Sequence, residues 1–238
     1  MNLGPDAPAL RALYFAPRRR LMFRLGTYGA LIRTMAVGHL VKAFYGHSQL
    51  VAQTHARLAR TRQTLRDLIW HGFESAEGEA AVARLLQAHR HVVAAPEDYA
   101  YVLSVFVLEP LRWNDAAGGP PLSAGELALL LGFWDRVGRA MAIPALPRTL
   151  ADWQAFQAQY ERRRWRYTDE GRRLASMCLD EVVTLSLPWG TRSLFRQLMR
   201  VTMDPALREL LKLPAPAGLP AAAMRSGLRV VLRRHGAG

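Results

Sequence analysis

The chain has 238 residues, half of them hydrophobic, so it can bury a large core as one domain. Its formal net charge is +13, and nearly all the cations are arginines, since Lys42 and Lys212 are the only lysines. A solvated arginine-rich surface, an anionic membrane, nucleic acid or an anionic cofactor would each suit this charge. Cys178 is the only cysteine. A single cysteine excludes an internal disulfide, a multi-cysteine zinc site, a cysteine-ligated iron–sulfur cluster and CxxCH haem attachment.

The N-terminal region has no uninterrupted apolar core of the signal-peptide type. Residues 21–45 are largely apolar, but basic residues interrupt them at intervals too short for a membrane-spanning helix. The basic cluster 18–20 with the apolar residues 21–23 suits either a peripheral contact with lipid or docking of the first helix on the core. With the lone cysteine, this indicates a cytoplasmic protein, with peripheral membrane contact as the alternative.

Residues 21–46 and 48–71 both follow helical spacing. Along the second segment, Arg60 and Thr64 lie four residues apart and are therefore neighbours on one helix surface. Together with Asp67 and His71 they form a polar line. From the residues alone, such a line is most simply a solvated edge with an intrahelical ion pair.

Another helix is predicted from residue 76, after these two segments, with Ser75 as its N-cap and acidic residues in its first turn. Its apolar stripe follows the spacing of the buried face of an amphipathic helix and consists of Val82, Leu85, Leu86, His89 and Val92. A histidine on such a face is either a metal ligand or a core histidine that is hydrogen-bonded to a backbone carbonyl. The spacing does not decide between these two roles for His89.

The run from residue 99 to 109 is apolar on all sides, which suits a buried helix or a buried strand, and Pro110 should end or kink it. Residues 115–121 form a loop by composition. Ser123 and Glu126 form a capping box that opens the next helix, and Thr149 caps the one after it.

Further helical patterns cover residues 169–185, 193–201, 205–213 and 221–234. No alternating strand, P-loop, GxGxxG, HExxH or GxSxG motif is present. We therefore predict an all-α fold, a single helical domain of roughly eight to ten helices over residues 25–213. A basic segment (1–24) precedes it, and a Pro/Ala linker with a basic helix that packs on the domain (214–238) follows.

Residues 98–161 contain the elements DY…L…F…EP.RW, E…FW..VG..M.IP..P and YE in order. In this order and spacing, the region resembles the MpaB-type oxygenases, which share a catalytic domain with latex-clearing protein, the bacterial rubber oxygenase. The N-terminal part is also similar, with an R-x-x-x-T pair (Arg60, Thr64) followed by a helix ending in H-x-x-V (His89, Val92). The resemblance covers roughly residues 25 to 230.

The resemblance implies an all-α domain that encloses b-type haem, with His89 as the proximal iron ligand and Arg60 and Thr64 near the haem on the facing helix. Arg60 could donate hydrogen bonds to dioxygen or pair with a haem propionate, and Thr64 could orient a water or the distal oxygen. One departure from latex-clearing proteins is Gln63, which stands where they have a lysine that can close the distal side. Closure by lysine, and the polyisoprene activity associated with it, are therefore not expected.

We expect a haem-dependent oxygenase that acts with dioxygen on a small, apolar, unsaturated or isoprenoid-like molecule. Phe44, Leu103 and Phe106 are candidates for lining its pocket. The alternative is a non-catalytic haem- or lipid-binding protein that kept the fold. Nucleic acid is not an expected partner, because the arginines are dispersed and no known binding motif is present. The oligomeric state does not follow from the sequence.

Overall fold

The computed structural model describes residues 7–45, 50–184, 192–216 and Ser226. Within these ranges the chain forms eleven helices and no strand, which confirms the predicted all-α class. The helices are α1 (Ala7–Phe15), α2 (Pro17–Thr34), α3 (Gly38–Tyr45), α4 (Leu50–His71), α5 (Ala76–His89), α6 (Pro96–Ala116), α7 (Ala124–Ala140), α8 (Leu150–Arg164), α9 (Asp169–Thr184), α10 (Arg192–Thr202) and α11 (Pro205–Leu210). The basic helix predicted over 221–234 falls almost wholly outside the described residues.

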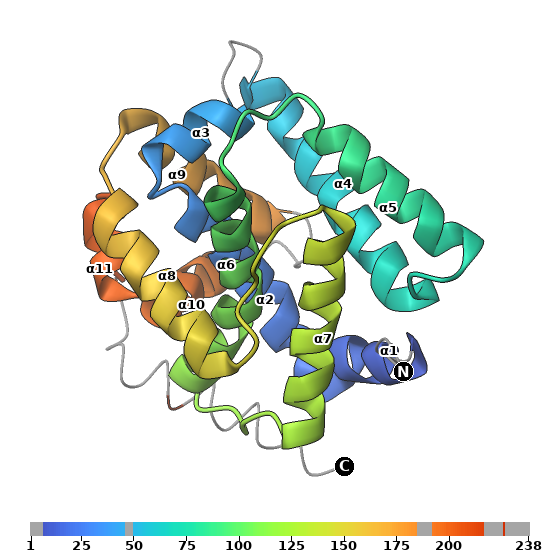
Figure 1. Ribbon diagram of the computed structural model, residues 1–238. Helices are drawn as coiled ribbons and strands as arrows, with labels where there is room; N and C mark the ends of the chain where they lie inside the picture. Colours follow the sequence, from blue (N-terminus) through green and yellow to red (C-terminus); the bar gives the residue numbers. More distant parts are fainter. Residues whose placement is uncertain (1–6, 46–49, 185–191, 217–225, 227–238) are drawn as a thin grey trace.

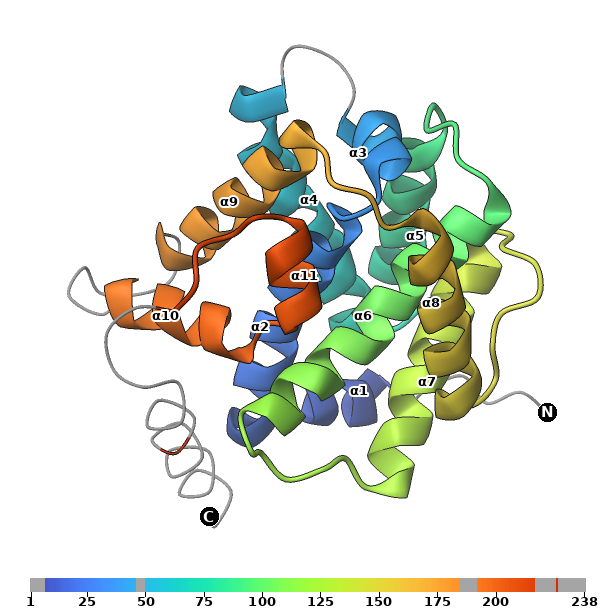
Figure 2. The ribbon, with the colours of Figure 1, turned by 90° about the vertical axis from the view of Figure 1, so that its left-hand side faces the viewer.

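Helix α6 runs through the centre of the molecule, with α4 and α5 to its right and α8, α10 and α11 to its left in Figure 1. Figure 2 again places α6 at the centre, between α7 and α8 on one side and α9 and α10 on the other. Because it is surrounded, α6 buries side chains on every side, which explains why its sequence shows no periodicity. The helical interpretation of residues 99–109 is therefore the right one.

Pro110 lies inside α6, and the helix continues past it to Ala116. A proline inside a helix gives up one backbone hydrogen bond, because it has no N–H. Helix α2 packs against α6 at this position. A Cβ atom at Gly26 of α2 would lie 2.3 Å from the Cα of Pro110. The backbones of α2 and α6 thus approach closely at this point, and only glycine leaves room for the contact.

The N-terminal helices belong to the same core. Leu10 of α1 and Met22 and Phe23 of α2 are buried. Arg19 is also buried, and its guanidinium forms two hydrogen bonds with the carboxylate of Glu126 at the start of α7, at 3.1 and 2.8 Å. Arg19, Met22 and Phe23 therefore dock α2 on the core. Among the described helices, none is long and apolar enough to cross a membrane.

Helices α4 and α5 form a hairpin that sets the direction of α5. Gly72 has a φ of 78° and ends α4, and the Ser75 side chain accepts a hydrogen bond from the N–H of Gly78 at 2.9 Å, as its predicted N-cap role requires. A Cβ at Gly78 would lie 1.7 Å from the carbonyl oxygen of Gly72. The connection is therefore tight, and α5 packs against α4.

The prediction of an apolar stripe on α5 is only partly correct. Val82 and Leu85 are half-buried against the core, but Leu86 is 43% exposed. Helix α5 ends at His89, so Val92 lies beyond it. The stripe is narrower than predicted because α5 lies at the edge of the molecule, where helical spacing identifies a face but not how much of it a neighbour covers.

A buried ion network joins four helices around Arg33, near the end of α2. Its guanidinium binds both carboxylate oxygens of Glu161 on α8, at 2.6 and 2.8 Å. It also contacts Glu109 of α6 at 3.2 Å and Asp204, the N-cap of α11, at 3.1 Å. Burial alone would lower the pKa of Arg33, but the contacts with Glu161 and Glu109 raise it above its usual value. Arg33 therefore stays charged and fixes α2 against α6, α8 and α11.

The contact between α2 and α6 predicts that Gly26→Ala will lower the free energy of unfolding by about 1–3 kcal/mol, because the new methyl group meets the backbone at Pro110. Urea unfolding followed by circular dichroism measures this change. Gly125→Ala is the matched control, since a Cβ there meets nothing within 4 Å, and it should leave stability unchanged or raise it by about 0.5–1 kcal/mol. Equal effects of the two substitutions would contradict the close approach.

The ion network predicts that Glu161→Gln will destabilise the protein by about 3–5 kcal/mol, because it leaves the buried Arg33 charge poorly compensated. Glu97→Gln removes a carboxylate from a more exposed pair with Arg163 and should cost at most about 1 kcal/mol. The same unfolding measurement compares the two variants. A Glu161→Gln protein as stable as Glu97→Gln would show that the network does not hold the helices together.

Candidate functional site

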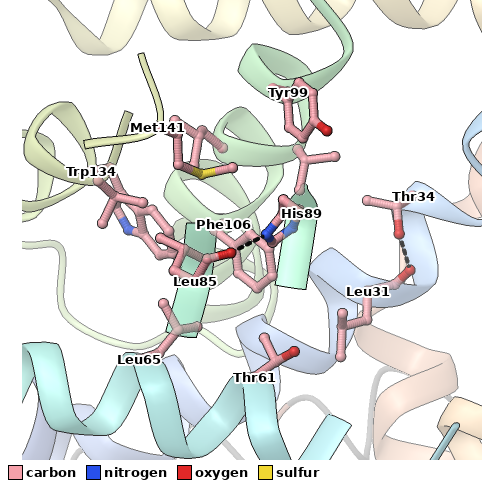
Figure 3. A pocket seen from close by; sticks show the side chains of 13 residues that line it. Leu31, Thr34, Thr61, Leu65, Leu85, His89, Tyr99, Phe106, Trp134 and Met141 are labelled. Carbon is pink, nitrogen blue, oxygen red and sulfur yellow. Dashed lines mark hydrogen bonds between the residues drawn. The ribbon is translucent and has the colours of Figure 1, made fainter. Parts of the chain in front are cut away.

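A cavity of about 140 Å³ lies between α2, α4, α5, α6 and α7 (Figure 3). Most of its lining is apolar, and Leu103 and Phe106, two of the predicted pocket residues, belong to it. The full lining is Leu31, Thr34, Thr61, Leu65, Leu85, His89, Tyr99, Val102, Leu103, Phe106, Trp134, Val137 and Met141. The side chain of Phe44, the third candidate, lies outside the described part of the chain.

His89 is the last residue of α5, and its side chain lines this cavity. Its Nδ1 lies 2.8 Å from the carbonyl oxygen of Leu85, one turn earlier in the same helix. A carbonyl oxygen can only accept, so Nδ1 must carry the proton, and in the neutral ring the lone pair is then on Nε2. The arrangement thus sets the tautomer of His89 (Figure 3).

This hydrogen bond fits both roles that the sequence left open for His89. A core histidine is satisfied by a backbone carbonyl, and a metal-bound histidine also donates its second N–H to a carbonyl or a carboxylate. The difference lies in the surroundings of the ring. His89 is only half-buried and lines a cavity, instead of being enclosed by packed side chains.

The segment after His89 is held by Tyr99 and Asp98 at the start of α6. The Tyr99 hydroxyl donates to the carbonyl oxygen of Val92 at 3.0 Å, and its ring lies 6.0 Å from the His89 ring, centroid to centroid. Asp98 accepts a hydrogen bond from the N–H of Ala95 at 2.9 Å and contacts Nε2 of His39 at 2.9 Å. The chain that follows His89 is therefore anchored to α6.

Three groups contact the carboxylate of Asp98, and they set its pKa. Burial alone would raise it, but hydrogen bonds from the Tyr160 hydroxyl, from His39 and from the N–H of Ala95 lower it below its ordinary value. Asp98 therefore stays ionised and joins the start of α6 to α3 and α8. This anchor was not among the predicted site residues, although Asp98 is part of the DY element.

Arg60 and Thr64, the other predicted site residues, do not line the cavity. Arg60 is exposed on α4, whereas Thr64 is buried. The residues that α4 contributes to the lining are Thr61 and Leu65, one position further along the helix in each case. A single step turns the helix surface by about 100°, so the sequence identified the helix but not the face that meets the cavity. The roles of Arg60 and Thr64 stay predictions.

Gln63, at the position where latex-clearing proteins have a lysine, is exposed. Its side-chain amide donates to Asp67 at 2.7 Å, and its oxygen accepts a hydrogen bond from Arg66. Among the described residues, no group of three or more His, Cys, Asp or Glu side chains could hold a metal ion. A haem iron needs only one or two ligands from the protein, so this observation does not bear on a haem.

One comparison with known proteins supports the resemblance noted in the sequence. No curated protein matches the chain. The family model described as the catalytic domain of ER-bound oxygenase mpaB/B′ and rubber oxygenase matches residues 15–234, which is nearly the whole sequence. The chain therefore belongs to this family of oxygenase catalytic domains.

Proposed function

We propose that this protein is a b-type haem-dependent oxygenase, with His89 as the axial iron ligand and a small, apolar, unsaturated or isoprenoid-like molecule as substrate. One observation carries the proposal. A histidine with a fixed tautomer lines an apolar cavity in a domain of an oxygenase family. Bound haem would supply the redox-active iron that activates dioxygen.

The residues at the cavity fit a haem. His89 offers the Nε2 lone pair of a neutral imidazole, which is the form that binds iron, and the Leu85 carbonyl holds the ring and tunes its electron donation. Phe106, Trp134 and their neighbours supply apolar surface of the kind that contacts a porphyrin face or a hydrocarbon substrate. A tetrapyrrole is larger than the 140 Å³ cavity, so it would also need the space adjoining it.

The polar residues in this proposal have distinct tasks. The Thr34 hydroxyl donates to the Leu31 carbonyl oxygen at 2.6 Å and thereby removes a polar group from contact with an apolar ligand. Thr61 supplies a hydroxyl from α4. Arg60 and Thr64 are proposed cofactor-contacting residues on the strength of the family resemblance alone, Arg60 as a hydrogen-bond donor or a propionate partner and Thr64 as a group that orients water or oxygen.

His89→Ala should abolish stoichiometric haem binding, lowering haem affinity by more than about 100-fold, since even loss of a residue that supports a ligand costs 10- to 100-fold. Titration with haemin, followed by reduction and addition of carbon monoxide, measures this in absorption spectra. His91→Ala is the control, because His91 is an exposed histidine two residues away and hydrogen-bonds to Arg90 instead of facing the cavity. Both this variant and the unmodified protein should bind one equivalent of haem.

Retention of one equivalent of haem with an unchanged spectrum in folded His89→Ala would contradict the ligand assignment. Catalysis is tested separately, by oxygen consumption of the haem-loaded protein with unsaturated isoprenoids and product analysis by mass spectrometry. Haem binding without oxygen consumption or product would favour the non-catalytic haem- or lipid-binding alternative.

A further inference from the structure

A second and larger cavity, of about 820 Å³, adjoins the cavity at His89. Leu65 and Trp134 line both of them. The larger cavity lies between α1, α2, α4 and α7, and its lining includes four arginines, Arg20, Arg24, Arg62 and Arg66. No described residue in the lining is acidic. We call this cavity the arginine groove.

The four arginines come as two pairs of like charges. Arg20 and Arg24 are four residues apart on α2, and Arg62 and Arg66 are four residues apart on α4. Such pairs are mildly destabilising in a helix, and here the two pairs line one groove. The only acidic residue of α4, Asp67, is bound to Arg84 of α5 at 2.6 Å. The described lining of the groove thus carries four arginines and no acidic side chain.

Arg24 and Arg62 are the members of this set that are partly buried. Burial lowers the pKa of Arg24, and the charges of Arg20 and Arg62 lower it further, against an opposing effect of Tyr28. Nη1 of Arg62 donates to the Tyr28 hydroxyl at 2.5 Å, and its guanidinium carbon lies 5.9 Å from the centre of the Tyr28 ring. Tyr28 is buried, so these contacts hold Arg62 in place.

Much of the remaining lining is aromatic. Tyr14 and Phe23 stack with their ring centroids 3.9 Å apart, and Trp70 and Trp134 lie in the same lining. The indole N–H of Trp134 is buried. A ligand suited to this groove thus combines an extended apolar surface with a negatively charged oxygen group.

We propose that the arginine groove binds the carboxylate of an amphipathic ligand whose apolar part reaches the cavity at His89, with Arg24 and Arg62 as the binding residues. A carboxylate of this kind is carried by a haem propionate or by an unsaturated long-chain acid. The haem alternative deepens the function proposed above and rests on it. The acid alternative does not need haem. In both cases a charge-assisted pairing with arginine fixes the orientation of the ligand.

Two pairs of ligands test this on the full chain. Haemin is compared with its dimethyl ester by absorption, and cis-parinaric acid with its methyl ester by fluorescence. At least one acid should bind about tenfold or more tightly than its ester, because a charge-assisted hydrogen bond is lost in the ester. The double variant Arg24→Gln/Arg62→Gln should weaken binding of that acid by a similar factor and leave binding of its ester within about twofold.

Arg162→Gln/Arg164→Gln is the control, since it removes the same charge from exposed positions on α8 that do not line the groove. It should bind acids and esters like the unmodified protein. The ligand pair that shows the effect identifies the source of the carboxylate. Equal affinity of acid and ester in both pairs would overturn the proposal, and this comparison needs only the unmodified protein.

The outcome also separates this proposal from the proposed function. If cis-parinaric acid shows the dependence on the two arginines while haemin does not bind, the groove assignment stands and the haem-dependent function fails. If haemin binds through His89 with no difference from its ester, and the fatty acid pair shows none either, the function stands and the groove assignment fails. Circular dichroism and thermal melts confirm that the variants are folded.

Discussion

One buried cation, Arg33, determines how the helices around the core are placed. Its guanidinium meets carboxylates from α6, α8 and the start of α11, and its planar donors fit the two oxygens of Glu161. Burying these charges is costly, so the network adds little net stability, although loss of one partner is severe. We infer that it acts chiefly by specifying geometry. Leu31 and Thr34, on either side of Arg33 in α2, line the cavity, so the placement of α2 shapes the site.

The site combines this rigid centre with a histidine at the edge of the fold. Helix α6 carries Phe106 and Tyr99 from the centre, whereas α5 brings His89 from a hairpin whose tight turn depends on Gly72 and Gly78. The tautomer of His89 is set within α5 by a carbonyl one turn away. Its electronic state therefore depends on local helix geometry, and its position depends on how the hairpin packs.

The helices and their caps could be predicted from the sequence, since Ser75, Ser123 and Thr149 act locally on the N–H groups that follow them. The run around Val105 was ambiguous because a segment buried on all sides has no periodicity. The site was only half predictable. His89 and Phe106 line the cavity, whereas α4 contributes Thr61 to the lining and not Arg60, whose role stays a prediction. Helical spacing cannot reveal where a neighbouring helix lies. The two arginine pairs of the groove lie about 40 positions apart in the sequence, and no local pattern indicates that they meet.

Resonance Raman spectroscopy of the reduced, haem-loaded protein tests the proposed bond between His89 and haem iron most directly. The iron–histidine stretching band should shift when the protein is made with ¹⁵N-labelled histidine. In labelled His89→Gly with unlabelled imidazole added, the band should return without the isotope shift, because the free imidazole then takes the place of the side chain. A band that persists with its isotope shift in His89→Gly would show that another of the seven histidines binds the iron, and would contradict the account.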